Sequence, residues 1–194
     1  MSELLTGKRI LITQADQFMG PMLCEVLRAK GATVIADDSD LSMAGVAEKV
    51  VADSGRIDVL LANLSIPAPS TPAAQVSEEE WQAVFAALVS PLPRLCAAVL
   101  PQMVERRAGK ILLMGSASAL RGMKRASTYS AARGAQLAYI QAIGVEMAEY
   151  NIQINAIAQN FVENPTYFPP EVQANPRFQE RLKREVPLGR LVGA

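Results

Sequence analysis

Short apolar runs of strand length alternate along the chain with longer segments in which apolar residues recur at helical spacing. This alternation is typical of a parallel sheet covered by helices, so the pattern predicts an α/β fold. The run at residues 57–63 has an unbroken apolar centre, which favours a strand buried on both faces. The expected strands are residues 9–13, 33–36, 57–63, 110–114 and 153–158.

Helices are expected between and after these strands. A single helix fits residues 41–53, a long one fits 127–150, and a short charged one fits 176–186. The proline-rich stretch 160–176 is expected to be an extended loop. Gly31 should end the first helix as its cap. The expected apolar face of that first helix consists of Met19, Met22, Leu23, Val26 and Leu27.

The middle of the chain carries a helix-start signal. Residues 64–72 contain three prolines and should form a loop. Ser77, with Glu80 three residues later, has the spacing of a capping box, which opens a helix. Pro91 and Pro93 are then expected to kink or restart that helix, because proline cannot continue the backbone hydrogen bonds.

Composition narrows the class of protein. A chain of 194 residues, 50% hydrophobic and 20% charged, suits one domain spanning 1–194. The 19 basic residues balance the 19 acidic ones, so charge gives no reason to expect a nucleic-acid or membrane partner. Histidine is absent, which excludes Ser-His-Asp triads and Cys-His pairs. The usual imidazole metal sites are excluded for the same reason, and no metal is expected.

The two cysteines and the apolar runs bear on the cellular compartment. Cys24 and Cys96 stand among apolar residues and are expected to be reduced core thiols. No apolar run approaches the roughly 20 residues that span a bilayer. The first ten residues lack the apolar stretch of a signal peptide. The sequence therefore predicts a cytoplasmic protein.

Candidate chemistry follows the strand at 110–114. Ligands of open α/β sheets bind beyond the carboxyl ends of the strands, where Ser116 lies. Tyr129 and Arg133 are four residues apart, so both should lie on one face of the long helix. A hydroxyl, a phenol and a guanidinium can thus converge. The alternative is that Ser116 is an ordinary turn hydroxyl and the Tyr/Arg pair contributes packing and surface charge.

Ser116 with Tyr129-Ser-Ala-Ala-Arg133 resembles the Ser/Tyr-x-x-x-Lys site of short-chain dehydrogenases, with arginine in place of the lysine. The segments Ile57-Asp-Val-Leu-Leu-Ala-Asn63 and Val186-Pro-Leu-Gly-Arg190 resemble two further motifs of that family. The resemblance implies a Rossmann-like three-layer sandwich with a mostly parallel sheet. Relatives continue beyond the last motif into another helix and strand, so the final strand of the sheet is expected to be absent from these 194 residues.

Departures from the dehydrogenase pattern argue against a nicotinamide cofactor. The first strand-to-helix turn of the family is Thr-Gly-x-x-x-Gly-x-Gly, whereas this chain has Gln14 and Phe18 at two of the glycine positions. Their side chains would stand where a pyrophosphate approaches the backbone. One helix–strand unit near the adenine is shortened, and Leu88 replaces an asparagine of the proton relay. Asp37 or Asp38 could contact a ribose, but solvated loop charges explain them as well.

These departures match the halohydrin dehalogenases, which resemble short-chain dehydrogenases but use Ser-Tyr-Arg and no nicotinamide. The resemblance implies a halide pocket formed by Phe18, Gln159, Asn160, Phe161 and Val162, and a substrate pocket that includes Leu64, Tyr167 and Phe168. Other members commonly have proline and tyrosine at positions 159 and 161, so the halide preference stays open. Core packing is the alternative role for Phe18 and Phe161.

The implied reaction uses each of the three site residues. Tyr129 would act as the base, Arg133 would favour its phenolate, and Ser116 would hold the substrate oxygen. The alkoxide would displace a neighbouring halide and form an epoxide, and small anions such as azide, cyanide or nitrite would open epoxides in reverse. The family is typically a homotetramer that contacts its copies through helices at 77–107 and 127–150. The alternatives are a nicotinamide-dependent reductase and a non-catalytic subunit.

Overall fold

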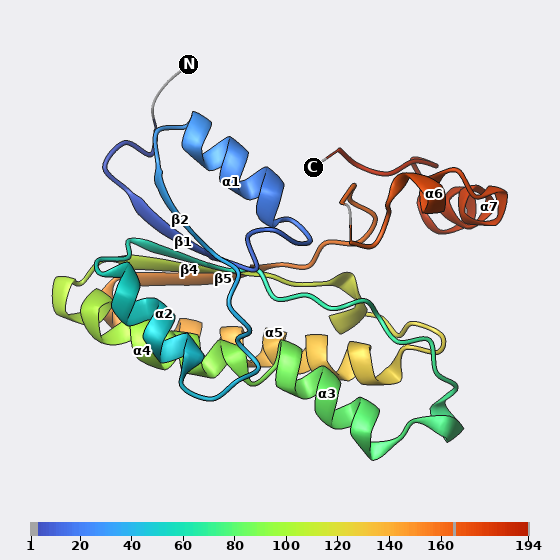
Figure 1. Cartoon of the computed structure of the whole chain (residues 1–194), viewed down its shortest axis with the longest axis horizontal. Coiled ribbons are helices and arrows are strands. Elements are labelled where there is room, and N and C mark those ends of the chain that lie inside the picture. Colours follow the sequence, from blue (N-terminus) through green and yellow to red (C-terminus); the bar gives the residue numbers. More distant parts are fainter. Residues whose placement is uncertain (1–3, 165, 194) are drawn as a thin grey trace.

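The computed structural model describes residues 4–164 and 166–193, and within them five strands form one parallel sheet (Figure 1). The strand order is β2-β1-β3-β4-β5, and all four pairings are parallel. The expected α/β fold is therefore confirmed. The strands are β1 (Arg9–Thr13), β2 (Thr33–Asp37), β3 (Val59–Ala62), β4 (Gly109–Met114) and β5 (Ile152–Ile157).

Helices cover the two faces of the sheet unequally. One face carries α1 (Gly20–Ala29), whereas α2 (Val46–Ser54), α4 (Pro91–Arg106) and α5 (Ser127–Met147) lie on the other (Figure 1). The helix α3 (Glu78–Leu88) packs along α5. The remaining elements are α6 (Pro170–Gln173), α7 (Pro176–Glu185) and three short 3-10 turns, η1 (Ala73–Gln75), η2 (Ala117–Ala119) and η3 (Ala148–Tyr150).

The alternation of side chains along each strand divides the core in two. Leu11 and Leu60 point into the larger cluster beneath α2, α4 and α5. Ile10 and Ile12 point to the opposite face, against α1. The centre of β3 is buried on both faces, as its unbroken apolar run predicts. Cys24 and Cys96 are buried and unpaired, as expected.

The predicted apolar face of α1 is rotated from the observed one. Met22 and Val26 are 37% and 45% exposed, and Cys24 is buried instead. Leu23 and Leu27 pack against the core as predicted. The helix therefore turns the side that contains Cys24, rather than the side that contains Met22, toward the sheet.

The strand β3 covers only four of the seven residues expected at 57–63. Three helical segments also differ from prediction, for local reasons. The helix expected at 41–53 begins only at Val46, because Gly45 adopts a left-handed φ of 80° and Asp40 holds a turn by accepting from the Ser42 amide. The loop expected at 160–176 contains the short helix α6, which begins at Pro170. The last turn of the helix expected at 127–150 tightens into η3.

The helix start at Ser77 is confirmed, although the capping box is only half formed. Ser77 Oγ accepts from the Glu80 amide at 3.2 Å. The Glu80 carboxylate instead accepts from the hydroxyls of Thr71 and Thr128 at 2.5 and 2.7 Å, and these bonds hold the pKa of Glu80 below its usual value. The chain restarts as α4 at Pro91, as predicted. Glu80 thus ties the first turn of α5 to α3.

One helical stretch, Glu78–Arg106, is long and apolar enough by length and composition to cross a membrane, contrary to the sequence-based expectation. It consists of α3 and α4, which are separated at residues 89–90. Both helices contribute side chains to the larger core cluster. A core helix passes the same test, so this stretch is weak evidence for a membrane span.

The topology places a crevice where the candidate residues lie. A single helix, α2, connects β2 to β3, as expected for the shortened helix–strand unit. The connection from β1 to β2 passes over one face of the sheet, and the connections between the later strands pass over the other face. Such a reversal opens a crevice at the carboxyl ends of the strands on either side of it, here β1 and β3. The loops after β4 and β5 leave the sheet at the same edge.

Candidate active site

Ser116 lies directly beyond β4, at the start of η2. Its Oγ accepts from the amide and the hydroxyl of Ser118, at 3.2 and 2.9 Å. The turn role that was the alternative for Ser116 is therefore real. However, both bonds use Oγ as an acceptor, and the Ser116 hydroxyl hydrogen has no acceptor among the described residues. Ser116 can still donate that hydrogen to a ligand oxygen.

Tyr129 and Arg133 lie in the first two turns of α5, on one face as the spacing predicts. The Arg133 guanidinium carbon is 5.0 Å from the centre of the Tyr129 ring. Thr128, beside Tyr129, is held by Glu80 of α3 at 2.7 Å. The backbone amide of Ala117 donates to the Gln159 carbonyl at 2.7 Å, which joins the Ser116 turn to the loop after β5.

Arg133 is a buried cation without a carboxylate partner among the described residues. Its side chain is 1% exposed. Nη1 donates to Gln136 Oε1 at 3.0 Å and to the Met114 carbonyl at 3.4 Å, whereas Nε and Nη2 have no partner. The Phe18 ring lies 5.9 Å from the guanidinium carbon. A buried guanidinium with unused donors is costly, and it favours negative charge nearby.

A second phenol, Tyr167, contacts the first. The hydroxyls of Tyr129 and Tyr167 are 3.1 Å apart, and Tyr167 donates its hydrogen to the Ile66 carbonyl at 2.7 Å. Tyr129 must therefore donate to Tyr167. Burial raises the pKa of Tyr167, so Tyr167 stays neutral and keeps a hydrogen to donate. If Tyr129 loses its proton, Tyr167 can turn its hydrogen from Ile66 toward the phenolate.

This contact gives a testable expectation for Tyr167→Phe. The change removes the only neutral donor that faces the Tyr129 hydroxyl among the described residues. A hydrogen bond to a charged group is worth about 1.5–3 kcal/mol, so turnover at neutral pH should fall about tenfold or more. Tyr150→Phe, outside the cavity, is the control, and an unchanged turnover in Tyr167→Phe would refute this role.

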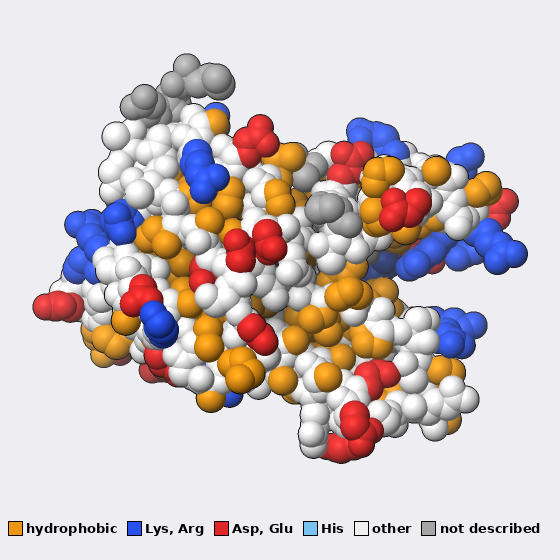
Figure 2. All heavy atoms as spheres, viewed as in Figure 1, with side chains coloured by type: hydrophobic (Ala, Val, Ile, Leu, Met, Phe, Trp, Pro, Cys, Tyr) orange, Lys and Arg blue, Asp and Glu red, His pale blue; other side chains and the backbone are white. Residues whose placement is uncertain are grey.

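The candidate residues line a cavity of about 630 Å³. Its walls include Ser116, Tyr129 and aromatic rings, and Figure 2 shows the surface hollowed between the lobe of α6 and α7 and the layer of α3 and α5. Arg133 lies behind Tyr129 and Phe18 rather than at the wall. The predicted site residues at the wall are Phe18, Ser116, Tyr129, Gln159, Asn160, Phe161, Tyr167 and Phe168.

The residues after β5 supply donors and apolar surface. Gln159 Nε2 is buried and has no partner, so it can donate to a ligand. Asn160 is exposed at the wall, and the Phe161 ring stacks on Phe168 with centroids 5.7 Å apart. Val162 packs against the Phe18 cluster rather than facing the cavity. The structure thus brings the predicted donors Gln159 and Asn160 to the cavity wall together with the predicted rings of Phe161 and Phe168.

Leu64 is the predicted substrate-pocket residue that the structure does not place at the wall. Its side chain is fully buried in the larger core cluster. The chain just past β3 turns Leu64 inward and is fixed by Gln14, whose Oε1 accepts from the Ser65 amide at 2.6 Å. The prediction placed Leu64 by its position after a strand, which does not determine the direction of its side chain.

The turn after β1 has backbone angles that favour glycine, although Gln14 and Phe18 stand at two of the family's glycine positions. Gln14 and Phe18 have left-handed φ values of 44° and 54°, which cost an ordinary residue roughly 1 kcal/mol or more. Gly20 remains necessary, because a Cβ there would lie 2.4 Å from the Gln14 carbonyl oxygen. The Phe18 amide donates to Thr166 Oγ1 at 2.7 Å, which ties this turn to the loop after β5.

A dinucleotide does not fit this turn. The side chain of Gln14 is bonded to Ser65, and that of Phe18 is 5% exposed, with its ring edge-on to Tyr167 at 5.2 Å. Both stand where glycines would let a pyrophosphate approach the backbone. The sequence shows that both positions carry large side chains. The structure adds that neither side chain points freely into solvent.

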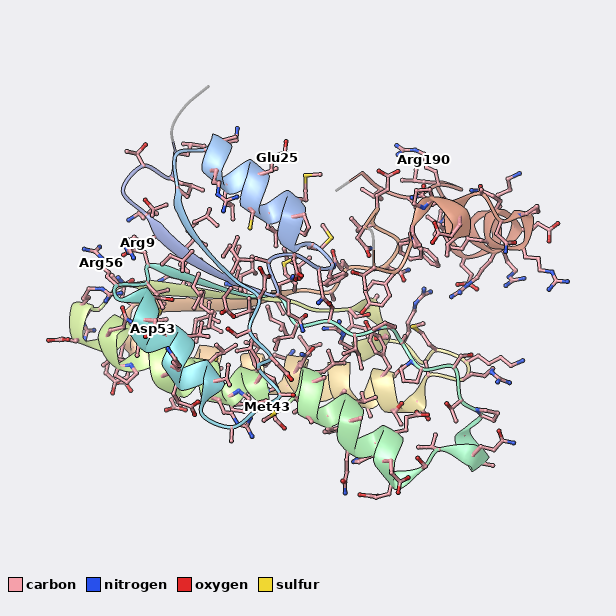
Figure 3. All side chains as sticks on the ribbon, viewed as in Figure 1. Arg9, Glu25, Met43, Asp53, Arg56 and Arg190 are labelled. Carbon is pink, nitrogen blue, oxygen red and sulfur yellow. The ribbon has the colours of Figure 1, made fainter. Side chains whose placement is uncertain are left out.

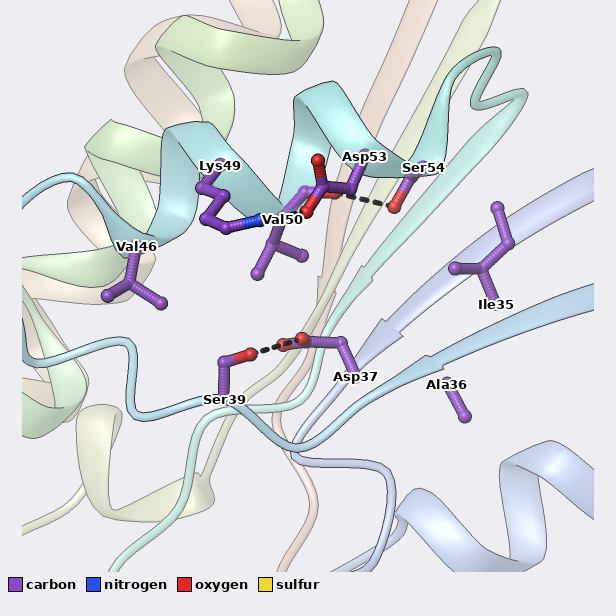
Figure 4. A pocket seen from close by; sticks show the side chains of 9 residues that line it. All are labelled: Ile35, Ala36, Asp37, Ser39, Val46, Lys49, Val50, Asp53 and Ser54. Atoms are coloured by element: carbon purple, nitrogen blue, oxygen red, sulfur yellow. Dashed lines mark hydrogen bonds and ion pairs between the residues drawn. The ribbon is translucent and has the colours of Figure 1, made fainter.

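A smaller cavity of about 230 Å³ lies beside α2, near the Asp53 label of Figure 3, and is seen closely in Figure 4. Asp37 Oδ1 accepts from Ser39 Oγ at 2.7 Å, while its Oδ2 is buried without a partner. Lys49 and Asp53 pair across the α2 side of the cavity. Asp38 instead accepts from the Asp16 amide. An unpartnered carboxylate oxygen could hold a hydroxyl, so Asp37 is the residue that best suits a ribose.

No cluster of acidic and cysteine side chains with the arrangement of a metal site occurs within residues 4–164 and 166–193. The functional residues that sequence reasoning missed are Thr166, the Ile66 carbonyl and a group of basic residues at the cavity wall. Arg121, Lys124 and Arg125 stand together between the candidate Ser116 and Tyr129, and that local run of charge was the available signal.

Comparison with known families and curated proteins gives one family match and several relatives. The sequence model described as short chain dehydrogenase matches residues 37–173. The 3-oxoacyl-(acyl-carrier-protein) reductase FabG of Escherichia coli K12 is 27% identical over 213 residues, covering 97% of this chain and 85% of the relative. The 5-keto-D-gluconate 5-reductase of the same strain is 31% identical, covering 87% and 74%.

Solved structures give a second group of similar proteins. A "dehalogenation enzyme" superimposes with a TM-score of 0.90 and 29% identity, covering 98% of this chain and 87% of that one. A halohydrin dehalogenase bound to ethyl (2S)-oxiran-2-ylacetate gives 0.86 and 26%, covering 96% and 85%. A gluconate 5-dehydrogenase of Burkholderia cenocepacia with NADP gives 0.89 at 21%, covering 98% and 85%, which supports the fold alone.

Proposed function

The chain belongs to the short chain dehydrogenase family, and within it we propose that this protein is a cofactor-independent halohydrin dehalogenase. One observation carries the proposal. Phe18 fills the place where the family's turn leaves room for pyrophosphate, and its ring lies over the cation that backs Tyr129. The similarity to two dehalogenase structures, at 29% and 26% identity, supports the same assignment.

The proposed forward reaction begins with proton transfer. Tyr129, as phenolate, takes the hydroxyl proton of a vicinal halohydrin, while Ser116 donates a hydrogen bond to the same oxygen. Arg133 stabilises the phenolate through its proximity, and arginine stays charged throughout. Tyr167 supplies a further donor to the phenolate. Ser116 stands at the start of η2, and Tyr129 and Arg133 lie on α5. These two elements pack against each other, so substrate binding needs no rearrangement of the site.

Ring closure and halide release complete the reaction. The alkoxide oxygen forms a bond to the adjacent carbon as the carbon–halogen bond breaks, and the halide leaves with the bonding electron pair. The products are an epoxide, a halide ion and a proton held on Tyr129, which passes to solvent. The Gln159 amide, at a wall flanked by aromatic rings, is the proposed donor to the leaving halide. In reverse, a small anion in that place opens the epoxide.

A nicotinamide-dependent reductase is the second candidate function. The curated relatives are reductases, and the unpartnered Asp37 oxygen could accept a ribose hydroxyl. The filled turn at Gln14 and Phe18 opposes this candidate, because a dinucleotide needs its pyrophosphate seated there.

One experiment separates the two functions. The purified protein, without added coenzyme, is expected to release bromide from 1-bromo-2-propanol and to form propylene oxide, measured by ion chromatography and gas chromatography. Titration with NADH or NADPH in a calorimeter should give no binding heat. Coenzyme binding in the micromolar range, together with no halide release, would establish the reductase instead. Neither activity would favour a non-catalytic subunit.

The expected homotetramer and cytoplasmic location are part of this proposal. The outer side of α5 exposes Ala138, Ala142 and Val145, the last 83% exposed. Trp81 on α3 stacks on Phe85 and is also exposed. An apolar surface of this kind suits a contact between copies of the chain. Light scattering of the purified protein measures the mass, and a monomer at micromolar concentration would contradict the tetramer.

A further inference from the structure

The wall of the large cavity is strongly basic away from the reacting groups. It carries four cationic side chains and a single carboxylate, that of Glu185. Glu185 is already engaged by Arg181 at 3.1 Å and Arg184 at 3.3 Å. The chain as a whole has 19 basic and 19 acidic residues, so this excess is local. The four cationic residues are Arg121, Lys124, Arg125 and Arg181.

The four cations come from two elements on opposite sides of the hollow. Three lie in the connection between η2 and α5, and Arg181 lies on α7. Figure 2 shows Lys and Arg side chains gathered along both sides of the hollow between the α6–α7 lobe and the α3–α5 layer. Convergence of positive charge from two elements focuses the field within the cavity.

The cations differ in how they are held. Arg125 donates to Ser70 Oγ at 3.3 Å and to the Ser70 carbonyl at 3.1 Å, and the Arg181 guanidinium lies 5.6 Å from the Phe161 ring. Within the described chain, Arg121 and Lys124 have no hydrogen-bond or ion-pair partner. Two cations are thus fixed at the wall, and two remain available to a ligand.

Basic residues at the other end of the sheet are satisfied by the protein itself. Arg56 pairs with Asp58 at 2.8 Å, and Arg9 donates to the carbonyls of Ser54 and Arg56 at 2.9 and 2.8 Å (Figure 3). Arg125 and Arg181 of the cavity also have acceptors, in Ser70 and Glu185, whereas Arg121 and Lys124 have none among the described residues. Like charges grouped with so few acceptors repel one another, and a bound anion would relieve this repulsion.

We propose that the substrate of this site carries an acidic group, a carboxylate or phosphate, which binds among Arg121, Lys124, Arg125 and Arg181 while its halohydrin or epoxide end reacts at Tyr129. This inference rests on the proposed function. A three-carbon halohydrin is far smaller than a cavity of about 630 Å³, so room remains for a chain that ends in the acidic group. Arginine is suited to either anion because its planar fork binds two oxygens at once.

The test compares substrates that differ in charge at similar size. Halide release is measured for 4-chloro-3-hydroxybutanoate, its neutral amide, and 3-chloro-2-hydroxypropyl phosphate. The value of kcat/KM for at least one anion is expected to exceed that of the amide tenfold or more, and the two anions show whether carboxylate or phosphate is preferred. The double variant Arg121→Gln, Lys124→Gln should bring this ratio to about one. Both side chains are exposed, and circular dichroism checks the fold.

The double variant Arg177→Gln, Lys183→Gln on α7 is the matched control, since it also removes two positive charges from exposed residues outside the cavity wall. Its ratio should equal that of the unaltered protein. A ratio of one or less in the unaltered protein, or an unchanged ratio in the double variant at Arg121 and Lys124, overturns the proposal of an acidic substrate. Either result leaves the proposed dehalogenase function standing. Absence of halide release from all three compounds and from 1-bromo-2-propanol overturns the proposed function and this inference together.

Discussion

Tyr129→Phe is expected to lower halide release about a thousandfold while the protein stays folded. The change removes one oxygen, whose only contact among the described residues is the 3.1 Å bond to Tyr167. The ring keeps its place against the Arg133 guanidinium. General base catalysis contributes about 10²–10⁴ to a rate. The titratable group that contacts the Tyr129 oxygen, Tyr167, cannot replace it as the base, because burial raises the pKa of Tyr167 and keeps it neutral. Initial rates of bromide release measure the effect.

Tyr139→Phe is the matched control for this variant. Tyr139 lies on the same helix, α5, but packs on the core near Cys96, and burial raises its pKa to about 12. Loss of its hydroxyl should leave halide release within about twofold. Tyr129→Phe with a rate close to that of the unaltered protein would remove Tyr129 from the mechanism, and an equal loss in Tyr139→Phe would point to a structural effect.

Arg133→Met is expected to lower both activity and stability. An opposite charge a few ångströms away favours an ionised group by about ten- to a thousandfold. Turnover at neutral pH should therefore fall about a hundredfold. Arg133→Lys, which keeps the charge, should retain more activity than Arg133→Met.

The free energy of unfolding should fall by about 2 kcal/mol in the same variant. The buried guanidinium leaves two nitrogen atoms without partners, each costing about 1–3 kcal/mol, and methionine removes that cost. The losses are larger. Two hydrogen bonds from a charged group and the contacts with the Phe18 and Tyr129 rings are together worth about 4–8 kcal/mol, and the buried Gln136 oxygen loses its donor.

Denaturant unfolding measures this change, with Arg9→Met as the control. Arg9 uses its guanidinium on two backbone carbonyls, so its loss should destabilise by about 1–2 kcal/mol. A gain of stability in Arg133→Met would contradict this balance and would place the burial of this charge among the costs of function.

The sequence by itself determined the α/β fold and the three central residues of the candidate site. Alternating strand and helix periods require a sheet with covering helices, because each element must bury its apolar side. Parallel strands end at one edge, so Ser116 after β4 was bound to lie near the crevice. The helical period places Tyr129 and Arg133 on one face of α5. These are local or topological constraints, and local pattern is enough to fix them.

Tertiary structure alone decided which distant residues meet. The bond between Tyr129 and Tyr167 joins residues 38 apart, and that between Phe18 and Thr166 joins residues 148 apart. Whether Leu64 faces the core or the cavity also depended on packing. The basic wall is assembled from the segment before α5 and from α7. Such contacts depend on how the loops pack against the sheet, and the short-range periods of the sequence carry no information about that packing.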